Sequence, residues 1–268
     1  MDAVKAKPTA AALAAALLAA LLSGCAALAP IDELTWSAPL AKSLPRQDGE
    51  AVEAARFSRQ RPGGFLGEWE PFFVLSGNTP TEYRLVESDG TVVMEADAVD
   101  GGSAIWRKIR IDLRRHPIME WRWRVPRDSG AGGEGGPSSS SPPVRISLGF
   151  DGDAAKLDFE DRAKLRLAKV LTPNGLPYAS LLYVWLNRLP AETVYSSPHT
   201  ERVRHVVVES GEGRLEQWVS VRRNVLEDYR RAFGEEPGDL VGIGLMTDPG
   251  DNGGPRRAYY GDITFRGR

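Results

Sequence analysis

Most of the chain repeats one pattern, in which short apolar runs are bounded by Gly, Pro, Asn or Asp. The run 117–125 shows it clearly, because Met119, Trp121 and Trp123 alternate with charged residues. This period of two is typical of a strand with one face in the core. It predicts strands over 72–76, 81–87, 91–97, 103–111, 117–125, 144–150, 180–187, 202–210, 215–223, 239–247 and 257–265. Such spacing favours a mainly β fold, an antiparallel β-sandwich or jelly roll with one or two short helices in the connections.

Two segments depart from the strand pattern and predict those helices. Residues 158–171 are charged and amphipathic. In the second segment, Asn224 is a favoured N-cap residue and Glu227 stands at the capping-box position. Gly234 then provides a C-terminal stop.

The composition divides the chain into a leader, a tether and one domain. Residues 25–56 have no clear period and predict a tether, so the β-sandwich domain is expected over 57–268. Residues 126–143 hold mainly Gly, Ser and Pro and nothing apolar larger than Ala. They predict a flexible loop within the domain, because strand patterns resume on both sides.

The first 24 residues have the pattern of a signal peptide. Lys5 and Lys7 precede an apolar run over 10–22 that is too short for a resident membrane span. The string Leu22-Ser23-Gly24-Cys25 resembles the lipobox of bacterial lipoproteins, which implies that Cys25 is lipidated and becomes the N-terminus. Ala26 follows, and the sorting rule that this resemblance implies favours an outer-membrane lipoprotein facing the periplasm. The alternative is a buried helix with an incidental cysteine.

Charge and residue counts exclude several classes of protein. The 34 Lys and Arg nearly balance the 36 Asp and Glu, which argues against nucleic acid as a partner. A single cysteine excludes a disulfide framework and a cysteine-based zinc site. The three histidines, His116, His199 and His205, lack the spacing of metal ligands, so no metal site is predicted.

Several strings resemble a bacterial family of uncharacterised proteins, the domain of unknown function 3047. They include Trp121-Arg122-Trp123-Arg124-Val125 and the segments 62–64, 67–69, 177–185, 227–234, 246–248 and 258–263. The chain departs from the family pattern in the loop 126–143. The resemblance implies an acidic, Asp-containing stretch before Arg145, and this sequence has mainly Gly and Ser there. It also departs at 248–253, where a Pro and a Gly separate the acids. The family name implies no activity.

A weaker resemblance is to jelly-roll carbohydrate-binding modules. Phe57-Ser58, Gly67-Glu68-Trp69 and the segment 259–263 follow the order of strings seen in those modules. The resemblance implies a structural calcium ion held by an early Glu and a late Asp. Ser58 replaces that Glu and removes one oxygen ligand, so no cofactor is expected, with structural calcium as the alternative.

Tryptophan and arginine side chains are the candidates for ligand binding. Trp69 and Trp106 lie beside charged or Gly-rich segments and could stack on a sugar ring, whereas Trp121, Trp123 and Trp185 are expected in the core.

Three arginines could form a guanidinium surface for a carboxylate or phosphate, namely Arg122, Arg124 and Arg145. The alternative is that each pairs with an acid on a neighbouring strand.

The acids Asp248, Asp251 and Asp262 could divide the roles of general acid and nucleophile. Asp and its Asn, Gly and Pro neighbours are also ordinary turn residues.

These patterns favour a lipid-anchored cell-envelope protein whose β-sandwich binds a glycan or another polar ligand without catalysis. The first alternative is an envelope polysaccharide hydrolase or lyase that uses the three aspartates. The second is a protein-interaction lipoprotein, which predicts a contiguous apolar patch.

Overall fold

The computed structural model describes eight segments of the chain, 44–72, 79–99, 102–127, 142–171, 176–187, 189–198, 200–249 and 256–268. Four features predicted above lie outside these segments: the signal peptide, Cys25, Asp251 and most of the loop 126–143. Within the described segments, no helix is long and apolar enough to cross a membrane.

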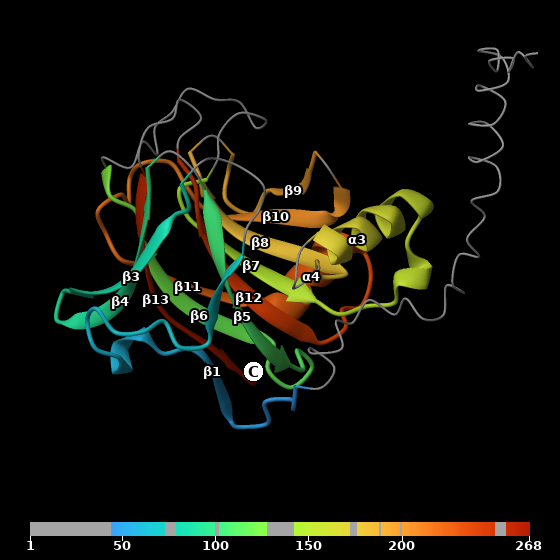
Figure 1. The fold of residues 1–268 in the computed structure, drawn as a ribbon, viewed down its shortest axis with the longest axis horizontal. Helices are drawn as coiled ribbons and strands as arrows, with labels where there is room; N and C mark the ends of the chain where they lie inside the picture. Colours follow the sequence, from blue (N-terminus) through green and yellow to red (C-terminus); the bar gives the residue numbers. More distant parts are fainter. Residues whose placement is uncertain are drawn as a thin grey trace, which may run out of the picture. The chain divides into compact units, whose positions relative to one another are not determined.

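The described residues form two β-sheets that share one core, which confirms a mainly β sandwich (Figure 1). The six-stranded sheet follows the order β11 (Val219–Asn224), β6 (Ile118–Arg124), β13 (Arg256–Arg266), β4 (Thr91–Ala98) and β3 (Glu82–Ser88), with β1 (Ala51–Ala55) also paired to β13. The seven-stranded sheet follows the order β2 (Trp69–Phe72), β5 (Ser103–Ile111), β12 (Leu240–Thr247), β7 (Arg145–Phe150), β8 (Ala179–Leu186), β10 (Thr200–Ser210) and β9 (Val194–Ser197).

One pair of strands departs from the antiparallel arrangement. Strands β8 and β10 run parallel, whereas the other pairs among the described strands are antiparallel. After β8 the chain forms β9, and β10 then pairs with β9 on one side and β8 on the other. Strand β10 therefore lies between β8 and β9, parallel to β8 and antiparallel to β9. The strictly antiparallel prediction is therefore wrong at this position.

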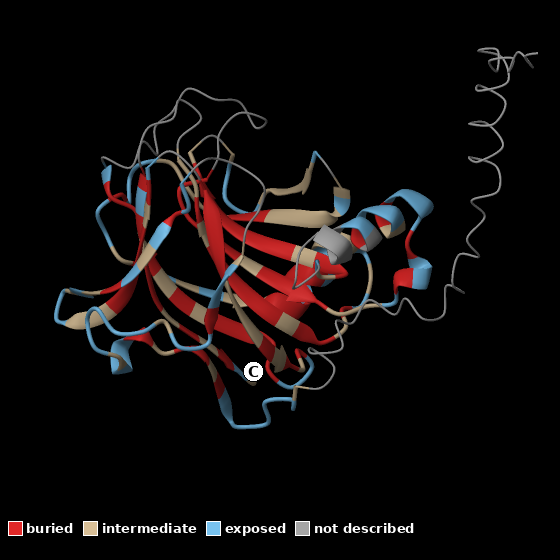
Figure 2. Cartoon of the chain, viewed as in Figure 1, coloured by how far each residue is buried: buried red, intermediate tan, exposed pale blue. Residues whose placement is uncertain are grey.

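The core lies between the two sheets, and Figure 2 shows buried residues along the strands of both. Trp121 and Trp123 of β6 face inward, whereas Glu120, Arg122 and Arg124 alternate with them on the outer face. The ring of Trp121 stacks on Tyr183 from the other sheet, with centroids 5.0 Å apart. Trp121, Trp123 and Trp185 are all buried, which confirms their predicted place in the core.

Both predicted helices are present, α3 (Phe159–Leu171) and α4 (Val225–Phe233), and short 3-10 turns occupy η2 (Phe57–Arg59) and η4 (Ala154–Lys156). At the start of α4, the side chain of Asn224 accepts a hydrogen bond from the backbone N–H of Glu227 at 3.3 Å. At its end, Gly234 adopts a left-handed φ of 68° and donates to the carbonyl of Arg230. The predicted N-cap and glycine stop are confirmed.

The sandwich begins earlier than predicted. Strand β1 lies within the segment 25–56, for which the sequence predicts a tether, and its pairing with β13 buries Val52 and Ala54. The alternation of Val52, Glu53 and Ala54 has the period of a strand, but it covers too few residues to stand out from an alanine-rich segment. Strand β2 likewise begins before the predicted strand 72–76, and β9 was not predicted.

Candidate functional site

Trp69 does not provide an exposed ring. Its side chain is 7% exposed and packs against Phe57, with ring centroids 5.7 Å apart. Its neighbour Glu70 is exposed, because successive side chains of a strand point to opposite faces. The prediction of Trp69 as a surface residue is wrong, since the charges beside it occupy the other face of β2.

Trp106 lies on the outer face of the seven-stranded sheet, the face directed away from the core. On β5 its neighbours Ile105 and Ile109 point into the core, so Trp106 and Lys108 point outward. The indole lies directly over Gly242 and Gly244 of β12 and reaches Gly149 of β7. A Cβ added at Gly242 would lie 2.2 Å from the ring, and one at Gly149 would lie 2.7 Å from it. The three glycines therefore form a floor of bare backbone that seats the indole against the sheet.

Trp106 has an aromatic neighbour on one side and a row of mixed character on the other. Phe72 of the edge strand β2 lies beside it, with ring centroids 5.8 Å apart, and both side chains keep an exposed part. Strand register continues the row from Trp106 through Gly244, Ser147, Leu182, His205 and Tyr195. The rings of His205 and Tyr195 stack in parallel at 4.6 Å.

Burial and the nearby charge of Arg145 lower the pKa of His205 to about 4, so its imidazole is neutral at neutral pH. Burial raises the pKa of Tyr195 to about 12. This part of the outer face is therefore uncharged, and Tyr195 packs there against the apolar cluster of Leu182, Val184, Leu186 and Val207.

Arg145 lies on the same outer face and forms an ion pair with Asp248, which follows β12. Its guanidinium also approaches the sulfur of Met246 at 3.2 Å. Both members of the pair are largely buried. Arg145 thus follows the alternative of pairing with a neighbouring acid.

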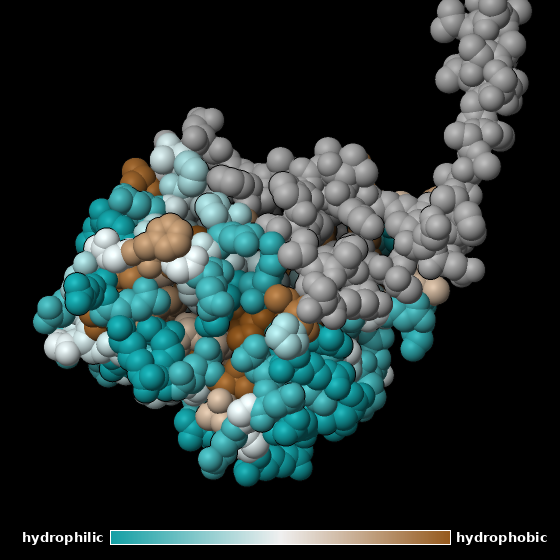
Figure 3. All heavy atoms as spheres, turned by 60° about the horizontal axis from the view of Figure 1, so that its bottom comes forward, coloured by the Kyte–Doolittle hydropathy of each residue, from teal (hydrophilic) through white to brown (hydrophobic). Residues whose placement is uncertain are grey.

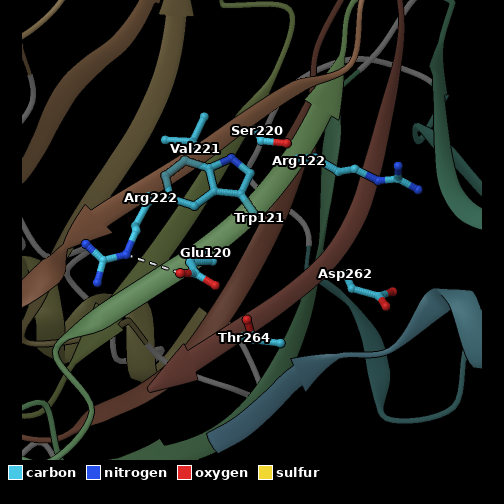
Figure 4. A pocket seen from close by; sticks show the side chains of 8 residues that line it. All are labelled: Glu120, Trp121, Arg122, Ser220, Val221, Arg222, Asp262 and Thr264. Carbon is cyan, nitrogen blue, oxygen red and sulfur yellow. Dashed lines mark hydrogen bonds and ion pairs between the residues drawn. The ribbon is translucent and has the colours of Figure 1, made fainter. Parts of the chain in front are cut away.

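A hollow of about 480 Å³ opens on the outer face of the six-stranded sheet (Figure 4). Its lining comes from β6, β11 and β13, namely Glu120, Trp121, Arg122, Ser220, Val221, Arg222, Asp262 and Thr264. In Figure 4, Glu120 and Arg222 pair on one side, while Arg122 and Asp262 extend towards the other. A bulge in β13 sets Gly261 and Asp262 opposite the single residue Arg122.

Arg122 and Arg124 form a ladder with two aromatic rings. Arg122 lies 4.6 Å from the centroid of Trp218, and Arg124 lies 5.4 Å from Trp218 and 4.4 Å from Tyr259. Arg124 also forms an ion pair with Asp89 at 3.4 Å. The hydrogen bond from the indole of Trp218 lowers the pKa of Asp89, and the charge of Arg124 adds to the effect.

The acids at this hollow already have partners. Glu120 pairs with Arg222 at 3.2 Å and with Arg266 at 2.8 Å. Asp262 accepts hydrogen bonds from the backbone N–H and the hydroxyl of Ser58, at 2.9 and 2.5 Å. The two positions that the module resemblance equates with calcium ligands thus meet, but they bond to each other. Among the described residues no group of three or more His, Cys, Asp or Glu could hold a metal ion.

The candidate residues therefore divide between two surfaces. On the seven-stranded sheet lie Trp106, Arg145 and Asp248. On the outer face of the six-stranded sheet lie Arg122, Arg124 and Asp262. Because the core separates these surfaces, Asp248 and Asp262 do not face a common cleft.

Sequence reasoning missed Trp218, Ser147, His205 and Tyr195. A signal was present for the Trp106 seat, because Gly242 and Gly244 alternate within a strand pattern and mark a close approach to the backbone. No local signal identified the others, since strand pairing alone places them beside the candidates.

Comparisons with known proteins place this chain in a family. No curated protein sequence matches the chain. Among solved structures it is similar to the glycoside hydrolase domain of Endo-D from Streptococcus pneumoniae R6, with 7% identity, a TM-score of 0.30 and coverage of 74% of this chain and 21% of that one. This chain thus spans about a fifth of that structure. A mutant of ENZbleach xylanase matches with 6% identity, a TM-score of 0.34 and coverage of 82% and 86%.

Both TM-scores are low and carry no argument about function. The model of one protein family, in contrast, matches residues 67–264, which is most of the chain. The chain belongs to the family described as "Protein of unknown function (DUF3047)".

Proposed function

We propose that this protein binds a glycan on the outer face of its seven-stranded sheet, with Trp106 as the stacking platform. The observation that carries the proposal is the seat of the indole on Gly242, Gly244 and Gly149. Three glycines on two adjacent strands hold a large aromatic ring flat against the sheet while part of it stays exposed. A flat ring in such a position suits the C–H face of a pyranose.

Polar groups beside the platform suit the hydroxyls of a sugar. Lys108 of β5 pairs with Glu70 of β2 at 3.0 Å, and Ser147 lies two strands away from Trp106 in the same row. The ion pair offers donors and acceptors next to the ring. We therefore propose a non-catalytic binding function in which ring stacking supplies affinity and these groups supply orientation.

A polar ligand also suits the character of the surface. In the view of Figure 3 the described surface is mainly hydrophilic, and hydrophobic atoms gather only in small groups. A protein-interaction surface of the kind set out above needs a contiguous apolar patch. The described surface in this view therefore consists mainly of groups that suit a polar partner.

We also propose that Cys25 is lipidated and holds the domain at the outer membrane, facing the periplasm. The support is the string 22–25 and the leader that precedes it. This placement would bring the binding face to the glycans of the cell envelope.

The platform is tested with the purified full-length protein in detergent, on a glycan array followed by calorimetry with the best ligand. Trp106→Ala should weaken binding at least about tenfold, because the stacking surface is lost. Gly242→Ala should weaken it too, since the added Cβ displaces the indole. Gly213→Ala is the matched control, because a Cβ there meets nothing within 4 Å.

The proposal fails if the folded wild-type protein binds no glycan. It fails equally if Trp106→Ala, with an unchanged unfolding midpoint, binds as tightly as the wild type.

A further inference from the structure

We infer that the hollow on the six-stranded sheet is a second binding site, which takes the carboxylate of an acidic sugar, with Arg122 as its anchor. The inference does not depend on Trp106, because the two sites lie on opposite sheets. It rests on the hydrogen bonding of the Arg122 guanidinium, on the contacts that hold this side chain in place, and on the charges around it.

Arg122 makes no hydrogen bond or ion pair with any described residue, although acids lie on the same face. Asp262 is bonded to Ser58, Glu120 is bonded to Arg222 and Arg266, and Asp89 is bonded to Trp218 and paired with Arg124. A guanidinium carries five N–H donors in a planar fork that matches a carboxylate. Arg122 therefore keeps this donor set for a ligand.

The side chain of Arg122 is held in place from two sides. Its guanidinium stacks over the indole of Trp218, and its stem lies across Gly261, where an added Cβ would be 2.5 Å from its Cγ. Stacking on a ring occupies the flat face of a guanidinium and leaves the donors at its edge available. Because these contacts already order the side chain, binding an anion loses less conformational entropy.

The rest of the hollow suits a polyhydroxylated ligand. Ser220 and Thr264 supply hydroxyls, and Glu120 and Asp262 have lone pairs beyond those used by their protein donors. The volume of about 480 Å³ falls within the range of small-molecule sites. A sugar unit with one carboxylate matches both the single anchor and these groups.

The charge around Arg122 selects a monoanion. The acids Glu120 and Asp262 line the same hollow, and Arg222 already compensates the first. Asp262 repels any anion in the hollow, but it repels a phosphate dianion about twice as strongly as a carboxylate with one negative charge. We therefore expect a carboxylate to bind in preference to a phosphate of similar size.

The test is a calorimetric titration of the full-length protein with sodium glucuronate, glucose and inorganic phosphate. Glucuronate should bind more tightly than either of the others, and its affinity should fall with added salt. Arg122→Gln should weaken glucuronate binding at least about tenfold. Arg122→Lys keeps the charge but not the fork, so it should lose several-fold.

Two variants control for other effects. Arg114→Gln removes the same charge from an exposed turn outside the hollow and should leave glucuronate binding unchanged. The titrations are repeated in the Trp106→Ala background, where Arg122→Gln should cause the same loss of glucuronate binding, which separates this site from the glycan platform. Equal binding by wild type and a folded Arg122→Gln, or tighter binding of phosphate than of glucuronate, would overturn the inference.

Discussion

His205 links the local environment of one side chain to the stability of the protein. Burial, and then the charge of Arg145, lower its pKa from 6.5 to about 4. Above pH 6.5 the imidazole is neutral in the folded and the unfolded chain alike. Between pH 6.5 and 4 the unfolded chain binds a proton that the folded protein does not, so the free energy of unfolding decreases as the pH falls. From pH 7 to pH 5 this loss is about 2 kcal/mol.

His205→Gln should therefore flatten the dependence of stability on pH by about 2 kcal/mol over this interval. The measurement is urea unfolding of both proteins at pH 7 and pH 5. Tyr195→Phe keeps a ring stacked on His205 and should keep the slope of the wild type. Identical slopes for wild type and His205→Gln would contradict the assigned pKa.

Single residues also show how far the sequence could define the candidate sites. The alternation along β6 was enough to bury Trp121 and expose Arg122. At Trp69 the alternation is too short to assign a face, because β2 has only four residues and only the next one, Glu70, carries a charge. The stacking of Arg122 on Trp218 could not be predicted, because it depends on the pairing of β6 with β11.

Helix α4 is fixed to both sheets by a buried carboxylate. Asp228 is 6% exposed and accepts hydrogen bonds from the hydroxyl of Tyr183 at 2.8 Å and from the guanidinium of Arg223 at 2.8 and 2.7 Å. Tyr183 belongs to β8 and Arg223 to β11, so one side chain joins the helix to a strand of each sheet.

Asp228→Asn should destabilise the protein by about 2 kcal/mol, because it removes the buried one of the two carboxylate charges, Asp228 and Glu192, that pair with Arg223. Denaturant unfolding measures the effect. Glu227→Gln is the matched control on the same helix, since Glu227 pairs with Arg268 at the surface and should cost less than about 1 kcal/mol. Similar losses for both variants would show that the buried network does not hold α4.

Elements with their own signal were predictable, and elements defined by a partner were not. The run 103–111 coincides with β5, and Asn224 and Gly234 delimit α4, because periodicity and capping are local properties. Strand β9 and the parallel pairing of β8 with β10 depend on where distant strands lie. No spacing in the sequence encodes those positions.

At the scale of the whole molecule, one core supports two outward surfaces with different chemistry. One sheet presents an indole on a glycine floor, and the other presents a guanidinium above a polar hollow. Because a core separates them, ligands at the two proposed sites would not compete for space. An envelope polymer with neutral and acidic sugars could engage both, which would raise its overall affinity through the local concentration of the second unit.

The proposed anchor would limit which glycans the two proposed sites can reach. Residues 26–43 lie between Cys25 and the first described residue, and that length of chain can span at most about 65 Å. If Cys25 is lipidated, the domain samples a layer of this depth beside the membrane, and its acyl chains hold it there. Both binding faces would then work close to a bilayer.

Cys25→Ser should release the protein into the soluble periplasmic fraction, because the acyl chains have no other attachment point in a chain with a single cysteine. The measurement is membrane fractionation with palmitate labelling in a Gram-negative host. Ala26→Asp should remain lipidated and move to the inner-membrane fraction. Arg122→Gln should stay with the outer membrane, which shows that glycan contacts do not cause the association. A Cys25→Ser protein that still sediments with membranes would overturn the anchor.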